Sequence, residues 1–407
     1  GDIAAERDKQ HRFSAYAQDS WSPKAGLTMN LGLRFDTSQV YNEVESLWRW
    51  TNIAPRLGFA WDVLNDGKNV VRGNYSRFYF PIIAQYVSGF STEYTSTTTY
   101  EWDEDAEEWT FRSRSGTPNS TELEDNKAPY TDEFSFGYER EIYRDVALGG
   151  NFIYRKSKRF LEDREINFVW DGLGGTDGDG NFSAGDSIDG SGDFRYSVGN
   201  IPGETEYKAL EIVARKNFSN NWQLLASYVL SKAEGDVMGD YGGSSSISAE
   251  WDTDAISTDG IGPYGRNQYG LMNFDQRHSF KLSGTYFFPY GFNAGATYGF
   301  TSGTPYNHFY YHDGYSGFAI LQDQRGQFNY EGRHQFDIRV EKSFELPWGN
   351  LGFLFDIFNL FNRSEVTQVR EFGEIEPGGV INDDDRFGEI LSRTAPRRVQ
   401  LGVRFTF

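Results

Sequence analysis

The amino-acid sequence predicts an all-β protein, an antiparallel β-barrel that crosses a membrane with strands. Three observations support this prediction. Apolar and polar residues alternate along many short segments, the connections between these segments are alternately short and long, and aromatic residues collect beside the short connections. Because successive side chains of a strand point to opposite faces, such alternation gives each strand one apolar and one polar face.

The overall composition excludes several other classes of protein. The chain has 407 residues, 17% aromatic residues, no Cys and a formal net charge of −20. This is the composition of a folded, acidic protein and differs from that of a basic nucleic-acid-binding protein. The mean hydropathy is −0.62, and no run approaches the roughly 18 to 20 apolar residues of a membrane helix. A membrane barrel keeps such a polar average because only one face of each strand meets lipid.

The alternation is clearest at the C-terminus. There, apolar residues occupy every second position up to the last residue, namely Val399, Leu401, Val403, Phe405 and Phe407. The intervening positions are Gln400, Gly402, Arg404 and Thr406. The same period of two runs through residues 27–36. Further strands of this kind are predicted to start near Phe13, Leu57, Val71, Phe134, Val146, Leu210, Trp222, Phe280, Phe292, Phe336 and Leu351.

These strands number thirteen, and each is about 9 to 11 residues long, as a tilted membrane span requires. An amphipathic strand of a soluble sandwich has the same alternation, so the connections have to distinguish the two folds. Tight turns are predicted at Ser22–Gly26, Leu64–Lys68, Tyr143–Asp145, Ser219–Asn221, Pro289–Gly291 and Leu346–Asn350. The stretches between these hairpins span roughly 15 to 50 residues, which is typical of outer-membrane barrels with short periplasmic turns and long outer loops.

Aromatic residues lie at strand ends on the side of the short turns. They are Trp21, Trp61, Tyr143, Trp222, Tyr290, Trp348 and Phe407. Amphipathic rings prefer the headgroup level of a bilayer, so this set is interpreted as the periplasmic aromatic girdle.

An odd number of strands has a consequence for closure, because the first and last predicted strands run in the same direction. Single-chain bacterial barrels close antiparallel with an even number. We therefore expect residues 1–407 to be the C-terminal part of a barrel completed by upstream strands or by a partner chain. The alternative is an additional strand within Phe90–Tyr100, where Thr and Tyr residues have strand propensity.

Several segments resemble the barrel of TonB-dependent outer-membrane receptors, particularly the Oar-like group. They are FSAYAQDSW at Phe13–Trp21, NIAPRLGFAWDV at Asn52–Val63, VRGNYSRFY at Val71–Tyr79, FDIFNLFNR at Phe355–Arg363, and the closing VQLGVRFTF. The terminal Phe also resembles the signal that barrel-assembly machinery recognises. Such receptors have 22 strands around a plug, so about nine strands, the plug and the TonB-contacting segment would lie outside residues 1–407.

The resemblance implies transport across the outer membrane of a Gram-negative bacterium. The solute would be bulky, with a peptide or protein as the expected class, and the inner-membrane proton gradient would drive its passage through TonB. The barrel would contact outer-membrane lipid and lipopolysaccharide. An alternative is an outer-membrane structural or adhesion component that displays acidic, calcium-stiffened loops. A secreted glycan-acting enzyme is disfavoured by the alternating connection lengths and the C-terminal Phe.

One segment, Gly175–Asp186, resembles an EF-hand or dockerin-type calcium loop. Asp177, Asp179 and Asp186 fall at loop positions three, five and twelve. Position one is Gly175 and lacks a carboxylate, so two interpretations stay open: a calcium site, or a solvated Asp- and Gly-rich outer loop. The acidic runs at Glu101–Glu108 and Asn382–Asp385 are interpreted as a solvated rim.

The sequence predicts neither an enzyme nor a nucleotide-binding protein. None of the five His belongs to a catalytic or zinc motif, His308 and His312 included, and no Gly-rich phosphate loop opens a helix. The charged residues expected on the inner wall should pair with one another across strands. They are Arg34, Arg155, Glu211, Asp337, Arg339, Glu341, Asp356 and Arg404.

Overall fold

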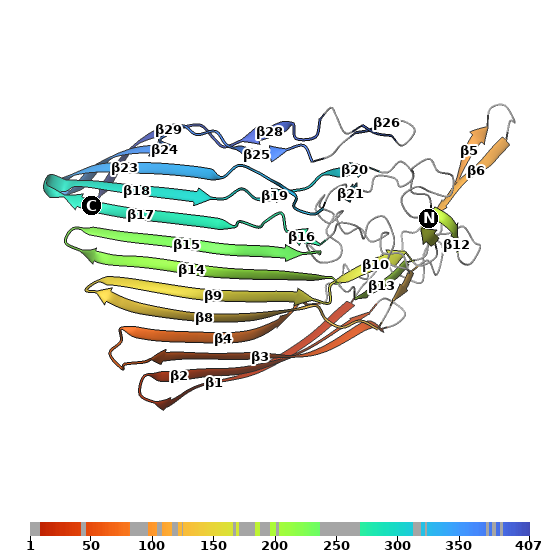
Figure 1. The fold of residues 1–407 in the computed structure, drawn as a ribbon, viewed down its shortest axis with the longest axis horizontal. Coiled ribbons are helices and arrows are strands. Elements are labelled where there is room, and N and C mark those ends of the chain that lie inside the picture. Colours follow the sequence, from red (N-terminus) through yellow and green to blue (C-terminus); the bar gives the residue numbers. More distant parts are fainter. Residues whose placement is uncertain are drawn as a thin grey trace.

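The computed structural model describes residues 9–41, 46–81, 97–103, 108–115, 121–123, 125–165, 168–170, 184–187, 196–200, 203–236, 269–311, 319–321, 324–371, 374–376, 380–382 and 386–407. Their main feature is one large antiparallel sheet (Figure 1). Its strands follow one another in the order β1 (Lys9–Lys24), β2 (Leu27–Tyr41), β3 (Ser46–Asp62), β4 (Asn69–Tyr79), β8 (Tyr130–Tyr143), β9 (Val146–Lys158), β14 (Glu204–Ser219), β15 (Trp222–Gly235), β17 (His278–Phe288), β18 (Phe292–Thr301), β23 (Arg333–Leu346), β24 (Gly349–Phe358) and β29 (Arg398–Thr406). Among the described residues, no helix is long and apolar enough to cross a membrane.

All thirteen predicted strands are present in this sheet, in chain order and with neighbours paired antiparallel. The fold class predicted from the sequence is therefore confirmed. Several strands are longer than predicted, since β1 has 16 residues and β3 has 17. The extension of β1, Lys9–Arg12, carries polar residues on both faces. The extension of β3 instead includes Trp48 and Trp50, whose side chains are buried.

The described part of the Thr-rich segment, residues 97–100, does not add a strand to the large sheet. Within it, the described residues begin β5 (Thr97–Asp103), which pairs with β6 (Glu108–Ser115) as a separate hairpin. β4 pairs directly with β8, so that hairpin lies in the connection between them. Among the described residues, one further strand joins the sheet beside the main path, the two-residue β16 (Gly270–Leu271) at the end of β15.

The connections separate the two ends of the sheet. Turns of two to six residues join the strands at one end, where the C-terminus also lies, and the described short strands of the other connections lie toward the opposite end (Figure 1). At that end only residues 42–45 link β2 to β3, so the predicted length of at least 15 residues is wrong for this connection, because both strands are longer than predicted. The turn between β14 and β15 shows how the sequence makes such a tight connection. Asn220 and Asn221 have φ values of 51° and 66°, the left-handed conformation that a two-residue hairpin turn requires and that Asn tolerates.

The long-loop end carries the short elements. They are β7 (Thr121–Leu123), β10 (Leu161–Glu165), β11 (Phe168–Trp170), β12 (Ala184–Ser187), β13 (Tyr196–Asn200), β19 (Pro305–Tyr306), β20 (Phe309–Tyr311), β21 (Ala319–Leu321), β22 (Phe328–Asn329), β25 (Val366–Val369), β26 (Glu374–Glu376), β27 (Val380–Asn382) and β28 (Ile390–Arg393). The largest described core cluster also lies there, where Val40, Trp48 and Trp50 pack against Ala128 and Leu161.

The register aligns the apolar residues of neighbouring strands on one face, which we call the outer face. Leu57 of β3 lies between Leu31 of β2 and Tyr75 of β4, for example. Leu401 of β29 faces Phe355 of β24, and 76% of its surface is exposed. A contiguous apolar surface of this kind is suited to lipid. The polar opposite face is called the inner face.

Toward the long loops, the outer face changes from apolar to charged. Asp132 of β8 lies opposite both Arg77 of β4 and Lys156 of β9, and Glu206 of β14 follows in the same row. Arg77 Nε lies 2.7 Å from Asp132 Oδ1, and the Tyr75 hydroxyl donates to the same oxygen at 2.9 Å. We call this set of residues the outer charged row; it marks the limit of the apolar surface.

Candidate functional site

The inner face carries the charged residues that the sequence predicts to pair. Arg339 of β23 donates from Nε and Nη2 to the two carboxylate oxygens of Asp356 on β24, at 2.6 and 2.8 Å. Arg404 of β29 forms an ion pair with the buried Glu341 of β23. The pairing prediction is thus confirmed for these four residues, and the pairs join β23, β24 and β29 across the inner face.

The other four residues predicted to pair on the inner face bind residues that were not among the predicted ones. Arg34 binds Asp36, two residues along the same strand, and Arg155 binds Glu133 on the neighbouring strand. Glu211 and Asp337 accept hydrogen bonds from neutral groups instead of cations. Their donors are Asn151 for the first, and the Gln335 amide and the Asn359 backbone N–H for the second.

A hollow of about 1010 Å³ lies along β1 to β14. Glycines line much of it, including Gly32, Gly58, Gly137 and Gly149. Because a glycine has no side chain, it leaves the space in front of a strand open to water, a solute or another protein segment. The polar lining includes Glu139, which lies 3.5 Å from Arg72 and 3.7 Å from Arg215.

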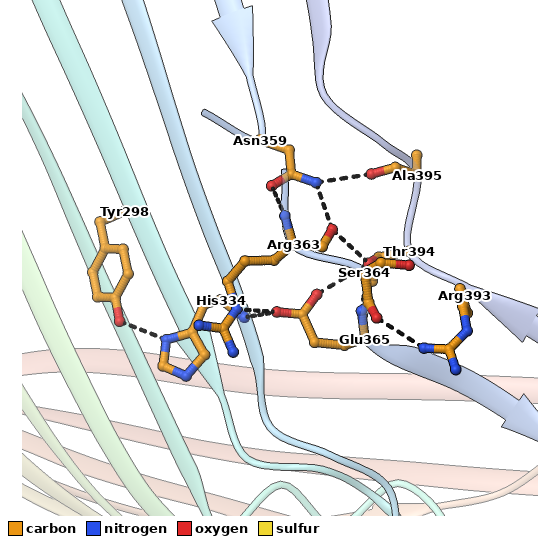
Figure 2. A network of polar contacts seen from close by, with 9 residues as sticks. All are labelled: Tyr298, His334, Asn359, Arg363, Ser364, Glu365, Arg393, Thr394 and Ala395. Atoms are coloured by element: carbon orange, nitrogen blue, oxygen red, sulfur yellow. Dashed lines mark hydrogen bonds and ion pairs between the residues drawn. The ribbon is translucent and has the colours of Figure 1, made fainter. Parts of the chain in front are cut away.

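The most connected polar network of the loop end begins where β24 ends (Figure 2). Asn359 and Asn362 have φ values of 53° and 51°, and the Asn362 N–H donates to the Asn359 carbonyl at 2.8 Å. This turn reverses the chain immediately after the strand. Both positions are Asn because its short polar side chain tolerates the left-handed conformation.

The same two side chains hold the segment that leads into β29. The Asn359 amide donates to the carbonyls of Arg363 at 2.8 Å and Ala395 at 3.0 Å, and its oxygen accepts the Arg363 N–H at 3.0 Å. The Asn362 oxygen accepts the Arg397 N–H at 2.9 Å. We call Asn359 and Asn362 the asparagine clamp, since they fix residues 395–397 beside the end of β24.

Glu365 forms the second part of the network (Figure 2). Its side chain is buried, and its carboxylate accepts from the His334 N–H at 3.2 Å, Arg363 Nε at 2.9 Å and the Thr394 hydroxyl at 3.0 Å. The Thr394 N–H donates to the Glu365 carbonyl at 2.9 Å. His334 in turn lies 2.8 Å from the Tyr298 hydroxyl through Nδ1.

These contacts keep Glu365 ionised although it is buried. Burial is the largest single influence and by itself raises the pKa of the carboxyl. The hydrogen bonds donated by the His334 and Glu365 N–H groups, Thr394 and Arg363 together outweigh it, so the pKa of Glu365 is lower than the ordinary glutamate value. The result is a stable, negatively charged connection between β23 and the two segments that flank β25 and β28.

The predicted calcium loop lies mostly outside the described residues. Asp177 and Asp179 belong to the part that the structure does not describe. Asp186 lies in β12, which pairs with β11, but its side chain is not described. Asp383, Asp384 and His312 also lie outside. His308 is buried, with its ring stacked 3.8 Å from that of Phe387. Across the described residues, no group of three or more His, Cys, Asp or Glu could hold a metal ion.

The asparagine clamp and Glu365 were not predicted as functional residues. Asn359 and Asn362 belong to the FDIFNLFNR segment, whose spacing of two asparagines around an apolar pair was the available signal. Arg363 is two residues from Glu365, but Thr394 and His334 are 29 and 31 residues away, so the sequence around Glu365 does not indicate these two partners.

Known proteins with similar sequences and folds agree with this architecture. Residues 47–307 match the family model described as "Outer membrane beta barrel domain". The TonB-dependent transporter Oar of Myxococcus xanthus is 25% identical over 474 residues, which cover 96% of this chain and 42% of Oar. The chain therefore spans less than half the length of this relative.

Solved structures show the same fold. The outer membrane transporter YddB from Escherichia coli has a TM-score of 0.55 at 15% identity, over 97% of this chain and 45% of that one. The ferripyoverdine receptor of the outer membrane of Pseudomonas aeruginosa has a TM-score of 0.56 at 10% identity, over 98% and 39%.

These relatives are transporters and receptors rather than enzymes, in agreement with the prediction from the sequence. They also establish the compartment, since the matched family and the transporters are those of the Gram-negative outer membrane. The match over residues 47–307, together with the thirteen-strand antiparallel sheet, shows that the chain belongs to the outer membrane β-barrel family.

Proposed function

We propose that residues 1–407 form the C-terminal part of the barrel wall of a TonB-dependent outer-membrane transporter. The observation that carries this proposal is the large sheet itself, with lipid-suited residues on the outer face and a polar inner face over thirteen strands. The similarity to the transporter Oar over 96% of the chain supports it. The remaining strands, the plug and the TonB-contacting segment would belong to the rest of a barrel of about 22 strands.

The inner face supports a bulky hydrophilic solute. Arg339 and Arg404 are paired with acids across strands, and the glycine-lined hollow is wide, with a volume of about 1010 Å³. Neither feature forms a tight apolar pocket of the kind that holds a small drug-like ligand. We propose a peptide or protein as the solute, with energy supplied through TonB.

The test uses cells with the full-length gene, cells lacking it, and cells lacking TonB. Each strain is incubated with a defined tryptic digest, and mass spectrometry follows the loss of individual peptides from the medium. We expect a subset of peptides to be depleted only when both proteins are present, and depletion to stop when a protonophore collapses the proton gradient.

Two outcomes would contradict the proposal at different points. Gene-dependent depletion that persists without TonB would contradict energised transport. Equal depletion in the presence and absence of the gene would contradict a peptide substrate. If surface adhesion alone changed on deletion of the gene, the structural or adhesion alternative would replace the transporter.

A further inference from the structure

A second cavity, of about 680 Å³, lies near the long-loop end of the inner face. Three arginines line it: Arg333 at the start of β23, Arg398 at the start of β29, and Arg397 immediately before β29. Arg333 lies opposite Thr301, and Gln335 lies opposite Gly299, both of which also line the cavity. Strands far apart in sequence therefore bring three guanidinium groups to one inner-face cavity.

None of the three guanidinium groups has a carboxylate partner among the described residues. Arg333 has no side-chain hydrogen bond or ion pair there. Arg398 stacks over the ring of Phe358, with 4.6 Å from Cζ to the ring centroid. Arg397 donates one hydrogen bond, from Nη1 to the Leu360 carbonyl at 3.3 Å. The inner-face arginines Arg339 and Arg404, by contrast, are each paired with an acid.

Glu365, which lines the cavity, and Asp337, two residues from the lining residue Gln335, are already bound to other groups. Glu365 lines the cavity but accepts hydrogen bonds from Arg363, Thr394 and the His334 N–H. Asp337 accepts from Gln335 and from the Asn359 N–H. The described part of the cavity therefore has an excess of positive charge, within a chain whose net charge is −20.

The backbone segments that carry the arginines are held by hydrogen bonds. The asparagine clamp holds the Ala395 carbonyl and the Arg397 N–H, and Glu365 holds Thr394. Arg333 and Arg398 themselves belong to paired strands. A frame of this kind fixes the backbone from which the three arginines project, which reduces the ordering that binding requires.

We propose that this cavity binds an oxyanion of the solute, a carboxylate or a phosphate, through Arg333, Arg397 and Arg398. This inference rests on the proposed transport function and deepens it by naming the chemical class of the bound group. Guanidinium groups match such oxyanions because their planar N–H forks donate two parallel hydrogen bonds. In an acidic chain, local cations also give an anion a binding position that the overall charge would otherwise disfavour.

The experiment is isothermal titration calorimetry on the full-length protein in detergent at low ionic strength. The probes are tetraglutamate, its uncharged counterpart tetraglutamine, and inorganic phosphate. Arg333→Gln, Arg398→Gln and the double variant are compared with Arg12→Gln. Arg12 is the matched control because it lies on β1, away from the cavity, and removing it changes the net charge equally. Circular dichroism and heat-modifiable gel mobility verify that each variant is folded.

We expect tetraglutamate to bind and tetraglutamine not to bind. Losing one charge-assisted contact should weaken binding roughly tenfold in each single variant and more in the double variant, while Arg12→Gln binds like the unmodified protein. Binding of phosphate alone, with the same dependence on the arginines, would assign the oxyanion to a phosphate source. The proposal would be overturned if the Arg333→Gln and Arg398→Gln variants bound tetraglutamate as tightly as the unmodified protein. It would also be overturned if Arg12→Gln weakened binding as much as those variants do.

The measurement is independent of energised transport, because equilibrium binding needs neither TonB nor a proton gradient. A protein that bound tetraglutamate through these arginines but depleted no peptide from the medium would retain this inference and lose the proposed function. If calorimetry showed no binding and the double variant still depleted peptides from the medium normally, the proposed transport function would be kept and this inference would be lost.

Discussion

Asn359 combines a strained backbone with three side-chain hydrogen bonds, so its substitution separates two contributions to stability. In Asn359→Ala, the lost hydrogen bonds cost about 1 to 3 kcal/mol, and a positive φ at Ala costs about 1 kcal/mol more. Asn359→Gly loses the same hydrogen bonds, but Gly adopts the positive φ of this position without strain. We therefore expect both variants to unfold at a lower urea concentration than the unmodified protein, and the Ala variant at the lowest.

The measurement is urea-induced unfolding in lipid vesicles, followed by tryptophan fluorescence. Asn350→Ala is the control, since Asn350 lies exposed at the other end of the same strand. An Asn359→Gly variant as stable as the unmodified protein would show that the clamp contributes nothing beyond its backbone conformation.

Glu365 makes the stability of the loop end depend on pH. Its folded-state pKa is lower than the unfolded value of about 4.3, so the ionised carboxylate contributes stability that is fully present above that pH. The contribution is lost as the pH falls through the folded-state pKa. We expect Glu365→Gln to lower the free energy of unfolding by about 1 to 3 kcal/mol at pH 7, and the difference to shrink below about pH 4.

Unfolding of both proteins is measured at pH 7, 5, 4 and 3. Glu345→Gln serves as the control, because Glu345 is exposed beside the turn after β23. A difference between Glu365→Gln and the unmodified protein that stayed constant across this range would mean that the charge of Glu365 is unimportant and that only its shape is required.

At the scale of elements, β29 tests the assignment of the two faces. Leu401 lies on the outer face and Gln400 on the inner face of this strand. Arginine on the lipid face of a barrel strand costs about 2 to 4 kcal/mol near the bilayer midplane, whereas inner-face changes cost little. Leu401→Arg should therefore reduce the folded fraction in vesicles much more than Gln400→Arg. Equal losses in the two variants would contradict the assignment of the faces.

The acidic loop stays a prediction of the sequence. If residues 175–186 bind calcium through Asp177, Asp179 and Asp186, terbium added to the full-length protein should show sensitised luminescence that calcium displaces. The triple Asp→Asn variant should lose this signal. Luminescence that the triple variant retained in full would leave the solvated-loop interpretation.

Strand positions could be predicted because alternation is a local property. The pattern of Val399 to Phe407 needs only neighbouring residues, and the structure places each predicted strand in the sheet. The outer ends of β8 and β14 escaped prediction, because these strands were expected to start near Phe134 and Leu210 and the charged Asp132 and Glu206 come before those apolar residues. Their partners Arg77 and Lys156 belong to other strands. The asparagine clamp could not be predicted either, because its partners are distant in sequence: Asn362 binds a residue 35 positions away.

For the whole molecule, the outer charged row indicates how the barrel sits in the membrane. Ion pairs such as Lys156 with Glu204, at 2.6 Å, are expensive in hydrocarbon but stable at the hydrated headgroups. Tyr154 donates to Glu206 at 3.2 Å from the row below, so its ring spans the boundary as interfacial aromatics do. The hydrocarbon should therefore end between Phe152 and Lys156 on β9, with the long-loop end beyond it in water.

Spin labels at single cysteines test this position directly. The 407 residues contain no Cys, so Leu148→Cys, Phe152→Cys and Lys156→Cys on the outer face introduce single labelling sites. Successive sites are separated by about 13 Å along the strand. Labels at the first two positions should be more accessible to oxygen, which partitions into hydrocarbon, than to a water-soluble nickel chelate. The Lys156 label should show the reverse.

Labels on the inner face provide the control for depth. Asn151→Cys and Arg155→Cys lie at the same levels but face the interior, so both should be accessible to the nickel chelate. A Lys156 label with the hydrocarbon signature of Phe152 would move the boundary toward the long loops and bury the outer charged row in lipid. Because unsolvated charges are unstable there, that result would require another protein surface to cover β4, β8, β9 and β14.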